Sequence, residues 1–236
     1  MTKTLNSTER EPLLSRRVML GAAVVATGAL LVSLATSRRS RPETAKAVHR
    51  RTNKLSTADL MKPGPLPDLS IGKADAPVTI VEYASMTCPH CAHFHNSVLP
   101  TLKEKYIDTG KARLVFREFP FDERGALAAM VARCAGSERA LPLISALYAK
   151  QDDWAQAKND FLQKLFGYAQ QAGFTKQAFD NCQHDEKLLK NIVAMRDRAI
   201  AFGVNATPTF FINGKKLAGA ATIEEFDKAI GPLLNP

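Results

Sequence analysis

Cys88 and Cys91 stand between a segment with the composition of a strand and a segment with the pattern of a helix. The run APVTIVEYAS, residues 76–85, is rich in β-branched residues, as a buried strand is. The stretch that begins at Cys91, CAHFHNSVLPTLKEKYIDTG, has a helical pattern that ends at Gly110. Pro100 lies inside this stretch and is expected to kink it. The chain must therefore fold with a Cys-x-x-Cys motif at the N-terminus of a helix that follows a strand.

The rest of the chain predicts a mixed α/β fold in which helices separate two groups of strands. A second strand pattern, ARLVFREFPF, covers residues 112–121, and residues 123–202 have apolar residues at helical spacing, with breaks that predict about four helices. The β pattern returns in TPTFFING, residues 207–214, whose Asn-Gly pair predicts a hairpin turn. A short strand follows, and then a last helix with a capping box of Thr222 and Glu225. The predicted order is βαβ, a helical block, then ββα.

The formal net charge of +9 lies almost entirely in the first part of the chain. Residues 1–54 hold 11 Lys and Arg against 3 Asp and Glu, which leaves the remainder close to neutral. A core that binds nucleic acid would carry its own basic face. The charge distribution therefore argues against nucleic acid as a partner.

The N-terminal residues have the organisation of a targeting segment. A polar stretch with several basic residues leads into an apolar run, residues 18–36, and SRRVML, residues 15–20, resembles a twin-arginine signal. We assign residues 1–37 to an export signal or membrane anchor, residues 38–68 to a basic, proline-rich linker, and residues 69–236 to the folded domain. Export predicts a periplasmic location, with membrane anchoring if the signal is not cleaved.

The cysteine motif has a metal-binding interpretation, in which nearby histidines complete the site. Zinc sites usually pair Cys-x-x-Cys with a second pair of ligands, and the chain has no second Cys-x-x-Cys. On a helix, His93 and His95 would point about 160° apart, so both cannot join the cysteines in one tetrahedral site. We expect no role in the chemistry for either histidine. A periplasmic copper or zinc carrier that uses Cys88, Cys91 and one histidine is the less favoured alternative.

The redox interpretation follows from the position of the motif at a helix N-terminus. There the first sulfur lies over unpaired backbone N–H groups, and the helix dipole stabilises a thiolate. Cys88 is expected to be the exposed cysteine and Cys91 the more buried one. Pro89 suits the first helical turn, and His90 adds a donor or a positive charge beside the sulfur. A low pKa of Cys88 would favour the dithiol and make the disulfide form oxidising.

CPHC after a strand, the late TPTFFING and the helical block between them resemble the DsbA family of thioredoxin-fold thiol–disulfide oxidoreductases. The resemblance covers residues from about 70 to 236. It implies a thioredoxin fold with a helical domain, about residues 123–202, inserted between the βαβ and ββα halves. It further implies an exported enzyme that introduces disulfide bonds into secreted proteins by exchange at Cys88 and Cys91. No cofactor or metal is implied. The implied partners are reduced secreted proteins and a quinone-linked membrane reoxidant of the DsbB type.

The resemblance also assigns roles to residues outside the motif. Pro208 is expected to follow a cis peptide bond, with its loop facing the cysteines, and the Thr207 backbone to bind a substrate chain as an added strand. Glu82 is expected to be buried beneath the site, where it would act on proton transfer to or from Cys91. Together with Pro89 and His90, Glu82 would tune the redox chemistry.

Cys134 and Cys182 lie in separate predicted helices and have no Cys-x-x-Cys partner. They are either two free thiols or a structural disulfide, and the resemblance favours the disulfide, because some DsbA-like proteins carry a second one. A disulfide isomerase or reductase of the same fold is the main alternative function. Residues 38–68 are long enough for the added oligomerisation segment that such isomerases use, but they are rich in proline.

Overall fold

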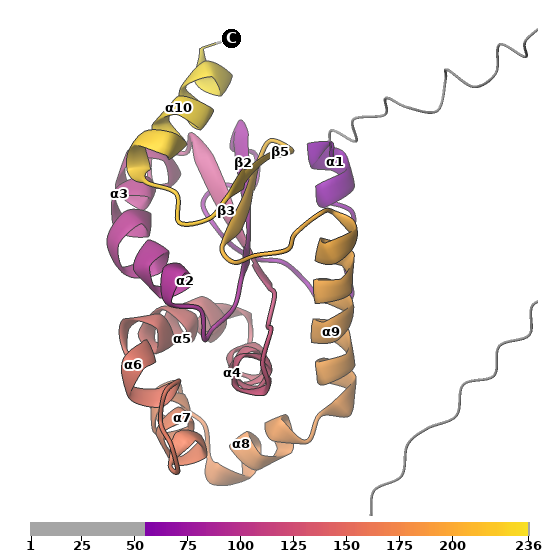
Figure 1. Cartoon of the computed structure of the whole chain (residues 1–236), viewed down its shortest axis with the longest axis vertical. Coiled ribbons are helices and arrows are strands. Elements are labelled where there is room, and N and C mark those ends of the chain that lie inside the picture. Colours follow the sequence, from indigo (N-terminus) through magenta and orange to yellow (C-terminus); the bar gives the residue numbers. More distant parts are fainter. Residues whose placement is uncertain (1–54, 236) are drawn as a thin grey trace, which may run out of the picture. The chain divides into compact units, whose positions relative to one another are not determined.

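A computed structural model describes residues 55–235, and Figure 1 shows how their helices and strands are arranged. The strands are β1 (Leu69–Ile71), β2 (Val78–Ala84), β3 (Ala112–Glu118), β4 (Thr209–Ile212) and β5 (Lys215–Ala218). The helices are α1 (Thr57–Leu60), α2 (Pro89–His93), η1 (Phe94–Val98), α3 (Leu99–Leu102), η2 (Lys103–Ile107), α4 (Glu123–Cys134), α5 (Ser137–Ala149), α6 (Gln151–Trp154), α7 (Phe161–Gln171), α8 (Lys176–Gln183), α9 (Glu186–Ala201) and α10 (Ile223–Leu234).

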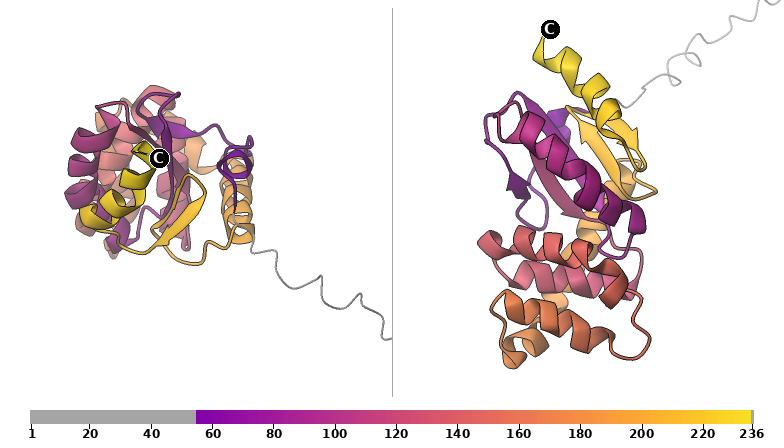
Figure 2. Two further views of the ribbon diagram at one scale, coloured as in Figure 1. Left: turned by 90° about the horizontal axis from the view of Figure 1, so that it is seen from above. Right: turned by 90° about the vertical axis from the view of Figure 1, so that its left-hand side faces the viewer.

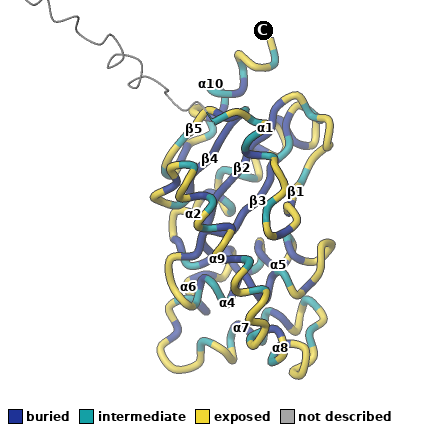
Figure 3. Tube along the Cα trace, turned by 90° about the vertical axis from the view of Figure 1, so that its right-hand side faces the viewer, coloured by how far each residue is buried: buried dark blue, intermediate teal, exposed yellow. Residues whose placement is uncertain are grey.

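The sheet has the order β1-β3-β2-β4-β5, with β2 and β3 parallel and the other neighbours antiparallel. The predicted βαβ and ββα halves are confirmed, while the edge strand β1 was not predicted. β2 is buried along its whole length, as its dark trace in Figure 3 shows. This burial on both faces explains its continuous run of apolar and β-branched residues.

Two hydrophobic clusters cover the faces of the sheet. On one face, Ile80 and Phe210 pack with residues of α3 and α10. On the other face, Val81 and Phe211 pack with residues of α1 and α9. Figures 1 and 2 show these helices on opposite sides of the strands. The alternation of side chains along β2 and β4 therefore supplies both layers of the core.

The helix that follows the cysteines is irregular. Two five-residue π-helical stretches, η1 and η2, flank the short helix α3. Pro100 lies in the first turn of α3, where its missing N–H does not cost an α-helical hydrogen bond. The predicted disturbance at this proline is thus present as a change of helix type.

The helical block lies between β3 and β4 in the chain and extends away from the end of the sheet (Figure 2). It contains α4 to α9, where about four helices were predicted. The difference arises mainly because α6 is a single turn and a loop at 155–160 separates it from α7. A disulfide between Cys134 and Cys182 joins α4 to α8. The longest helix of the block, α9, returns the chain to the sheet.

Residues 55–68 pack against the sheet, although the sequence placed them in a linker. Leu60 is fully buried. The guanidinium of Arg117 donates hydrogen bonds to the Leu60 carbonyl and to both carboxylate oxygens of Asp68. The predicted targeting segment, residues 1–37, and residues 38–54 lie outside the described residues. From residue 55 to residue 235, no helix has the length and apolar character needed to cross a bilayer.

The local signals near the C-terminus are also present. β4 and β5 form a hairpin in which Asn213 and Gly214 have φ values of 43° and 82°. These positive φ angles are the reason that an Asn-Gly pair occurs at the turn. Thr222 and Glu225 form the predicted capping box at the start of α10.

Candidate active site

Cys88 is the N-cap residue of α2, directly after the loop that leaves β2. Its backbone is extended, with φ −79° and ψ 119°, and Pro89 begins the helix. Pro89 and His90 are exposed, and Cys91 is fully buried one turn later. Cys88 was expected to be exposed, and this is wrong, because the residue is only 5% exposed.

The loop before β4 lies against Cys88. The Thr207–Pro208 peptide bond is cis, as the family resemblance implied, and the Cys88 Sγ lies 3.3 Å from the Thr207 carbonyl oxygen. β4 pairs antiparallel with β2, with Thr209 opposite Tyr83. This pairing brings two segments more than a hundred residues apart together, and the contact accounts for part of the burial of Cys88.

The surroundings of Cys88 stabilise its thiolate. Hydrogen bonds lower the pKa of Cys88 to about 5, against the effect of burial. The strongest comes from the Cys91 thiol, followed by the Thr207 side chain and the backbone N–H groups of Cys91 and His90. The sequence attributed this role of His90 to its side chain, whereas in the structure the residue acts through its backbone at the helix N-terminus.

The pKa of Cys91 is shifted in the opposite direction to that of Cys88. Burial is the main cause that raises the pKa of Cys91, and its hydrogen bond to Cys88 and the charge of Glu82 raise it further. Both cysteines are free thiols in this structure. In the dithiol, the negative charge therefore lies on Cys88, and Cys91 keeps its proton.

Glu82 is fully buried in the middle of β2, as the family resemblance implied. Its two carboxylate oxygens lie 3.1 and 3.0 Å from Nε2 of His95. The His95 side chain is 4% exposed and stacks on Tyr148, with ring centroids 4.3 Å apart. From the sequence, no role in the chemistry was expected for His95. The signal that could have found it is its position four residues after Cys91, on the same face of the helix, facing a strand with a buried acid.

The helical block contributes a second group that the sequence did not indicate. Nε2 of the buried Gln151 donates hydrogen bonds to the carbonyl oxygens of Met86, at 2.9 Å, and Cys88, at 3.0 Å. The Tyr148 hydroxyl donates to the Ser85 carbonyl at 3.1 Å. Residues of α5 and α6 thus fix the backbone of the loop that carries the cysteines.

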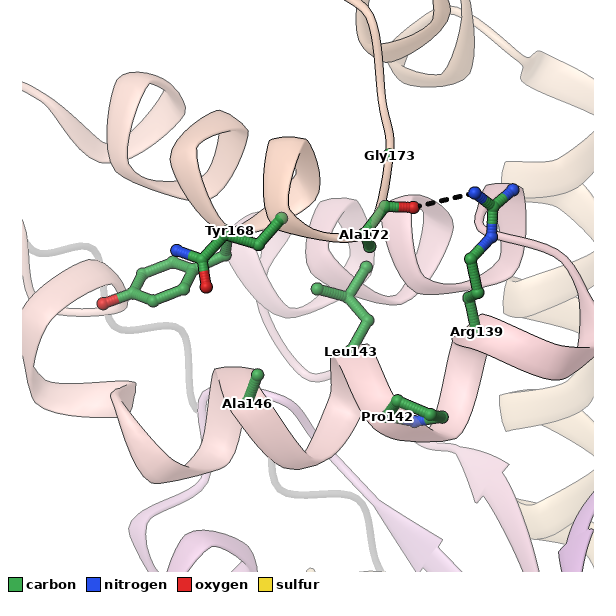
Figure 4. A pocket seen from close by; sticks show the side chains of 8 residues that line it. Arg139, Pro142, Leu143, Ala146, Tyr168, Ala172 and Gly173 are labelled. Atoms are coloured by element: carbon green, nitrogen blue, oxygen red, sulfur yellow. Dashed lines mark hydrogen bonds between the residues drawn. The ribbon is translucent and has the colours of Figure 1, made fainter.

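Two clefts differ in their relation to this loop. One, of about 340 Å³, runs beside Pro89 and Ala92 and is bounded by Tyr148 and Gln151. Another, of about 400 Å³, lies between α5 and α7 and is shown in Figure 4, where Arg139 donates a hydrogen bond to the Ala172 carbonyl. The second cleft is lined by helical-block residues only, so it is separate from the thiols.

Among the described residues, no group of three or more His, Cys, Asp or Glu side chains is placed to hold a metal ion. The chemistry that the site itself supports is thiol–disulfide exchange. It combines a stabilised thiolate, a buried protonated thiol, a neighbouring acid and a cis-proline loop at the first sulfur.

Comparisons with known proteins agree with this geometry. A family model described as thioredoxin matches residues 66–231. A putative protein-disulfide oxidoreductase of Rickettsia bellii (strain RML369-C) is 35% identical over 150 residues, which cover 62% of this chain and 57% of that protein. The chain thus spans little more than half the length of this relative.

Solved structures extend the match over more of the domain. The crystal structure of Wolbachia pipientis α-DsbA1 has a TM-score of 0.69 and 35% identity, and the match covers 76% of this chain and 96% of that one. Oxidised BdbD from Bacillus subtilis has a TM-score of 0.65 at 24% identity, covering 72% of this chain and 94% of that one, and supports the fold alone.

Proposed function

The chain belongs to the DsbA-like family of thioredoxin-fold thiol–disulfide oxidoreductases, and we propose that it is an exported oxidase that introduces disulfide bonds into secreted proteins. The observation that carries the proposal is the asymmetry of the two thiols. Cys88 has a pKa of about 5, while that of Cys91 is raised. A stabilised thiolate favours the dithiol and makes the Cys88–Cys91 disulfide a strong oxidant.

The proposed reaction begins with the disulfide form of the protein. A substrate thiolate attacks the Cys88 sulfur, a mixed disulfide forms, and Cys91 leaves and takes up a proton. A second substrate thiolate then attacks the substrate sulfur of the mixed disulfide. This step releases the oxidised substrate, and Cys88 leaves as a thiolate, which its hydrogen bonds stabilise.

Substrate binding is assigned to the cis-proline loop. The Thr207 backbone lies next to the Cys88 sulfur, and an extended substrate segment could pair with it as an added strand. Pro208 would hold this loop in place. Pro89 and His90, exposed beside the sulfur, would meet the substrate and tune the exchange. Glu82 would act on the proton of Cys91.

The partners and location follow from the sequence and the family. Substrates would be reduced secreted proteins in the periplasm, and turnover would need a quinone-linked membrane reoxidant of the DsbB type. The targeting pattern of residues 1–37 supports export, with the twin-arginine route as one candidate. The reaction as proposed uses no cofactor or metal, and the nearly neutral folded part supports no nucleic-acid partner.

The decisive experiment measures the reduction potential of the Cys88–Cys91 pair by equilibration with glutathione, together with oxidation of a reduced, unfolded ribonuclease. We expect an oxidising potential and rapid oxidation of the ribonuclease, both lost in Cys88→Ala. A strongly reducing potential would reject the oxidase. Poor oxidation combined with efficient repair of scrambled ribonuclease would identify an isomerase instead.

A further inference from the structure

The contact between Glu82 and His95 lies under the redox motif and places a carboxyl group in the protein interior. A lone carboxylate that is fully buried costs several kcal/mol in lost solvation. Within residues 55–235, His95 is the hydrogen-bond partner of the Glu82 carboxylate. The charge on Glu82 therefore depends on the protonation of His95.

The second nitrogen of the ring is buried and has no partner. His95 Nδ1 makes no hydrogen bond to any described group. Buried histidines are usually fixed in one tautomer because the far nitrogen donates to a carbonyl or carboxylate. Here the ring is oriented from its other side, where Nε2 lies within hydrogen-bond distance of both carboxylate oxygens of Glu82.

The rings around His95 hold its position without adding charge. Tyr148 stacks on one side, and Phe94 and Phe116 meet the imidazole edge-on. Burial raises the pKa of Tyr148 well above its ordinary value, so its hydroxyl stays neutral. The imidazole is thus held toward Glu82 by packing.

The other titratable groups around the pair are few. Cys91 and Cys88 lie on the α2 side. Glu118, at the end of β3, forms an ion pair with Arg133 of α4 and is thereby neutralised. The Cys91 sulfur is the one that must take up a proton during exchange, because Cys88 leaves as a stabilised thiolate.

We propose that His95 and Glu82 act as one unit that carries a single transferable proton for Cys91, with His95 as the positioning residue that acts through Glu82. This rests on the exchange reaction proposed above. When the substrate thiolate attacks Cys88, the S–S bond breaks and its electron pair stays on Cys91. The neutral pair gives its proton to that thiolate and becomes negative, and solvent later returns one proton to the pair. Reoxidation runs the same transfer in reverse.

The direction of transfer agrees with the electrostatics. Burial and the charge of Glu82 raise the pKa of Cys91, so a proton on the pair moves downhill to the new thiolate. Without His95, the fully buried Glu82 carboxylate would lose the hydrogen-bond partner that it has within residues 55–235.

The test compares His95→Gln with His93→Gln, a matched change at an exposed histidine of the same helix. Glutamine can donate to Glu82 but cannot carry the second proton. We measure the rate at which reduced glutathione reduces the Cys88–Cys91 disulfide from low to high pH, corrected for glutathione thiolate. His95→Gln should slow the reaction at neutral pH by about 10-fold, which is less than the roughly 10²- to 10⁴-fold contribution of a direct general acid because His95 acts through Glu82. It should also abolish an inflection in the pH profile that His93→Gln retains.

Two further measurements make the result independent of simple destabilisation. Glu82→Gln should lose the same inflection, and the double variant should be no slower than either single one, because the residues act as a unit. In the wild-type protein, the ¹⁵N resonances of His95 should change with pH and with the redox state of the cysteines, while those of His93 should not follow the redox state.

The outcomes separate this inference from the proposed function. If the wild-type protein does not exchange disulfides with glutathione, the proposed function fails. If it does exchange, the inference alone is overturned by a rate and pH profile of His95→Gln that match the wild type. It is also overturned if the rate effects of the two substitutions add in the double variant, or if the ¹⁵N resonances of His95 do not change with the redox state of the cysteines.

Discussion

The low pKa of Cys88 predicts that the dithiol protein gains stability as the pH rises from 4 to 7. The thiol has a pKa of about 5 in the folded protein, against an ordinary value of 9.0. Folding therefore releases a proton from Cys88 between these two values, and stability rises with pH wherever the unfolded state binds more protons. The contribution is absent below pH 5, grows through pH 7 and is complete above pH 9.

The size of the effect follows from the same two values. Each pKa unit corresponds to about 1.4 kcal/mol. At pH 7, two units above the folded pKa, Cys88 should contribute about 2.7 kcal/mol to the free energy of unfolding, and above pH 9 about 5.4 kcal/mol. Because the residue is only 5% exposed, little of this is lost to solvent screening.

The assay is urea unfolding of the dithiol protein at pH 4 and at pH 7, compared with Cys88→Ala, both with the Cys134–Cys182 disulfide intact. Other carboxylates and histidines titrate in both proteins, so the difference between them isolates Cys88. That difference should increase by about 2.7 kcal/mol between the two pH values. The disulfide form has no Cys88 thiol and serves as a second control. A difference that stays flat from pH 4 to 7 and grows only above pH 7 would refute the low pKa.

Three other substitutions test the contacts that hold the domain together, each measured as the free energy of unfolding in urea. Gln151→Ala leaves the buried Met86 carbonyl unpaired, removes one of two hydrogen bonds to the Cys88 carbonyl and should cost about 1–3 kcal/mol. Gln156→Ala, at an exposed position of the adjoining loop, should stay within about 0.5 kcal/mol. Arg117→Leu removes the hydrogen bonds that a buried guanidinium donates to the Leu60 carbonyl and the Tyr83 hydroxyl, and should cost about 1–3 kcal/mol for each of these groups. Replacing Cys134 and Cys182 together by alanine opens a loop with a sequence separation of 48 and should cost about 4 kcal/mol.

The features predicted from the sequence are those with a local physical cause. A β-branched run, a helix N-terminus at Cys88, the Asn213-Gly214 turn and the Thr222 capping box each depend on residues a few positions apart. Each can be recognised from a short segment of the sequence, and all four features are present in the structure. The cis bond before Pro208 came from the family resemblance and not from local chemistry.

The features that were missed depend on contacts between distant segments. Cys88 was expected to be exposed because a helix N-terminus projects from the sheet, but the Thr207 loop, 119 residues away, lies against it. The Glu82–His95 pair joins a strand to a helix, and the helical periodicity that separated His93 from His95 correctly indicated opposite faces. The error was to assign both faces to solvent or packing, when one of them meets a buried carboxylate.

The helical block is part of the redox site and not an independent lid. Tyr148 and Gln151 donate hydrogen bonds to three carbonyls of the loop between Ser85 and Cys88, and Tyr148 also stacks on His95. Displacing α5 and α6 from the sheet would leave the Met86 carbonyl unpaired, at a cost of about 1–3 kcal/mol. It would also remove one of two hydrogen bonds from each of the Ser85 and Cys88 carbonyls, and the ring that stacks on His95. The geometry of both thiols therefore depends on the insertion staying docked against the loop that carries them.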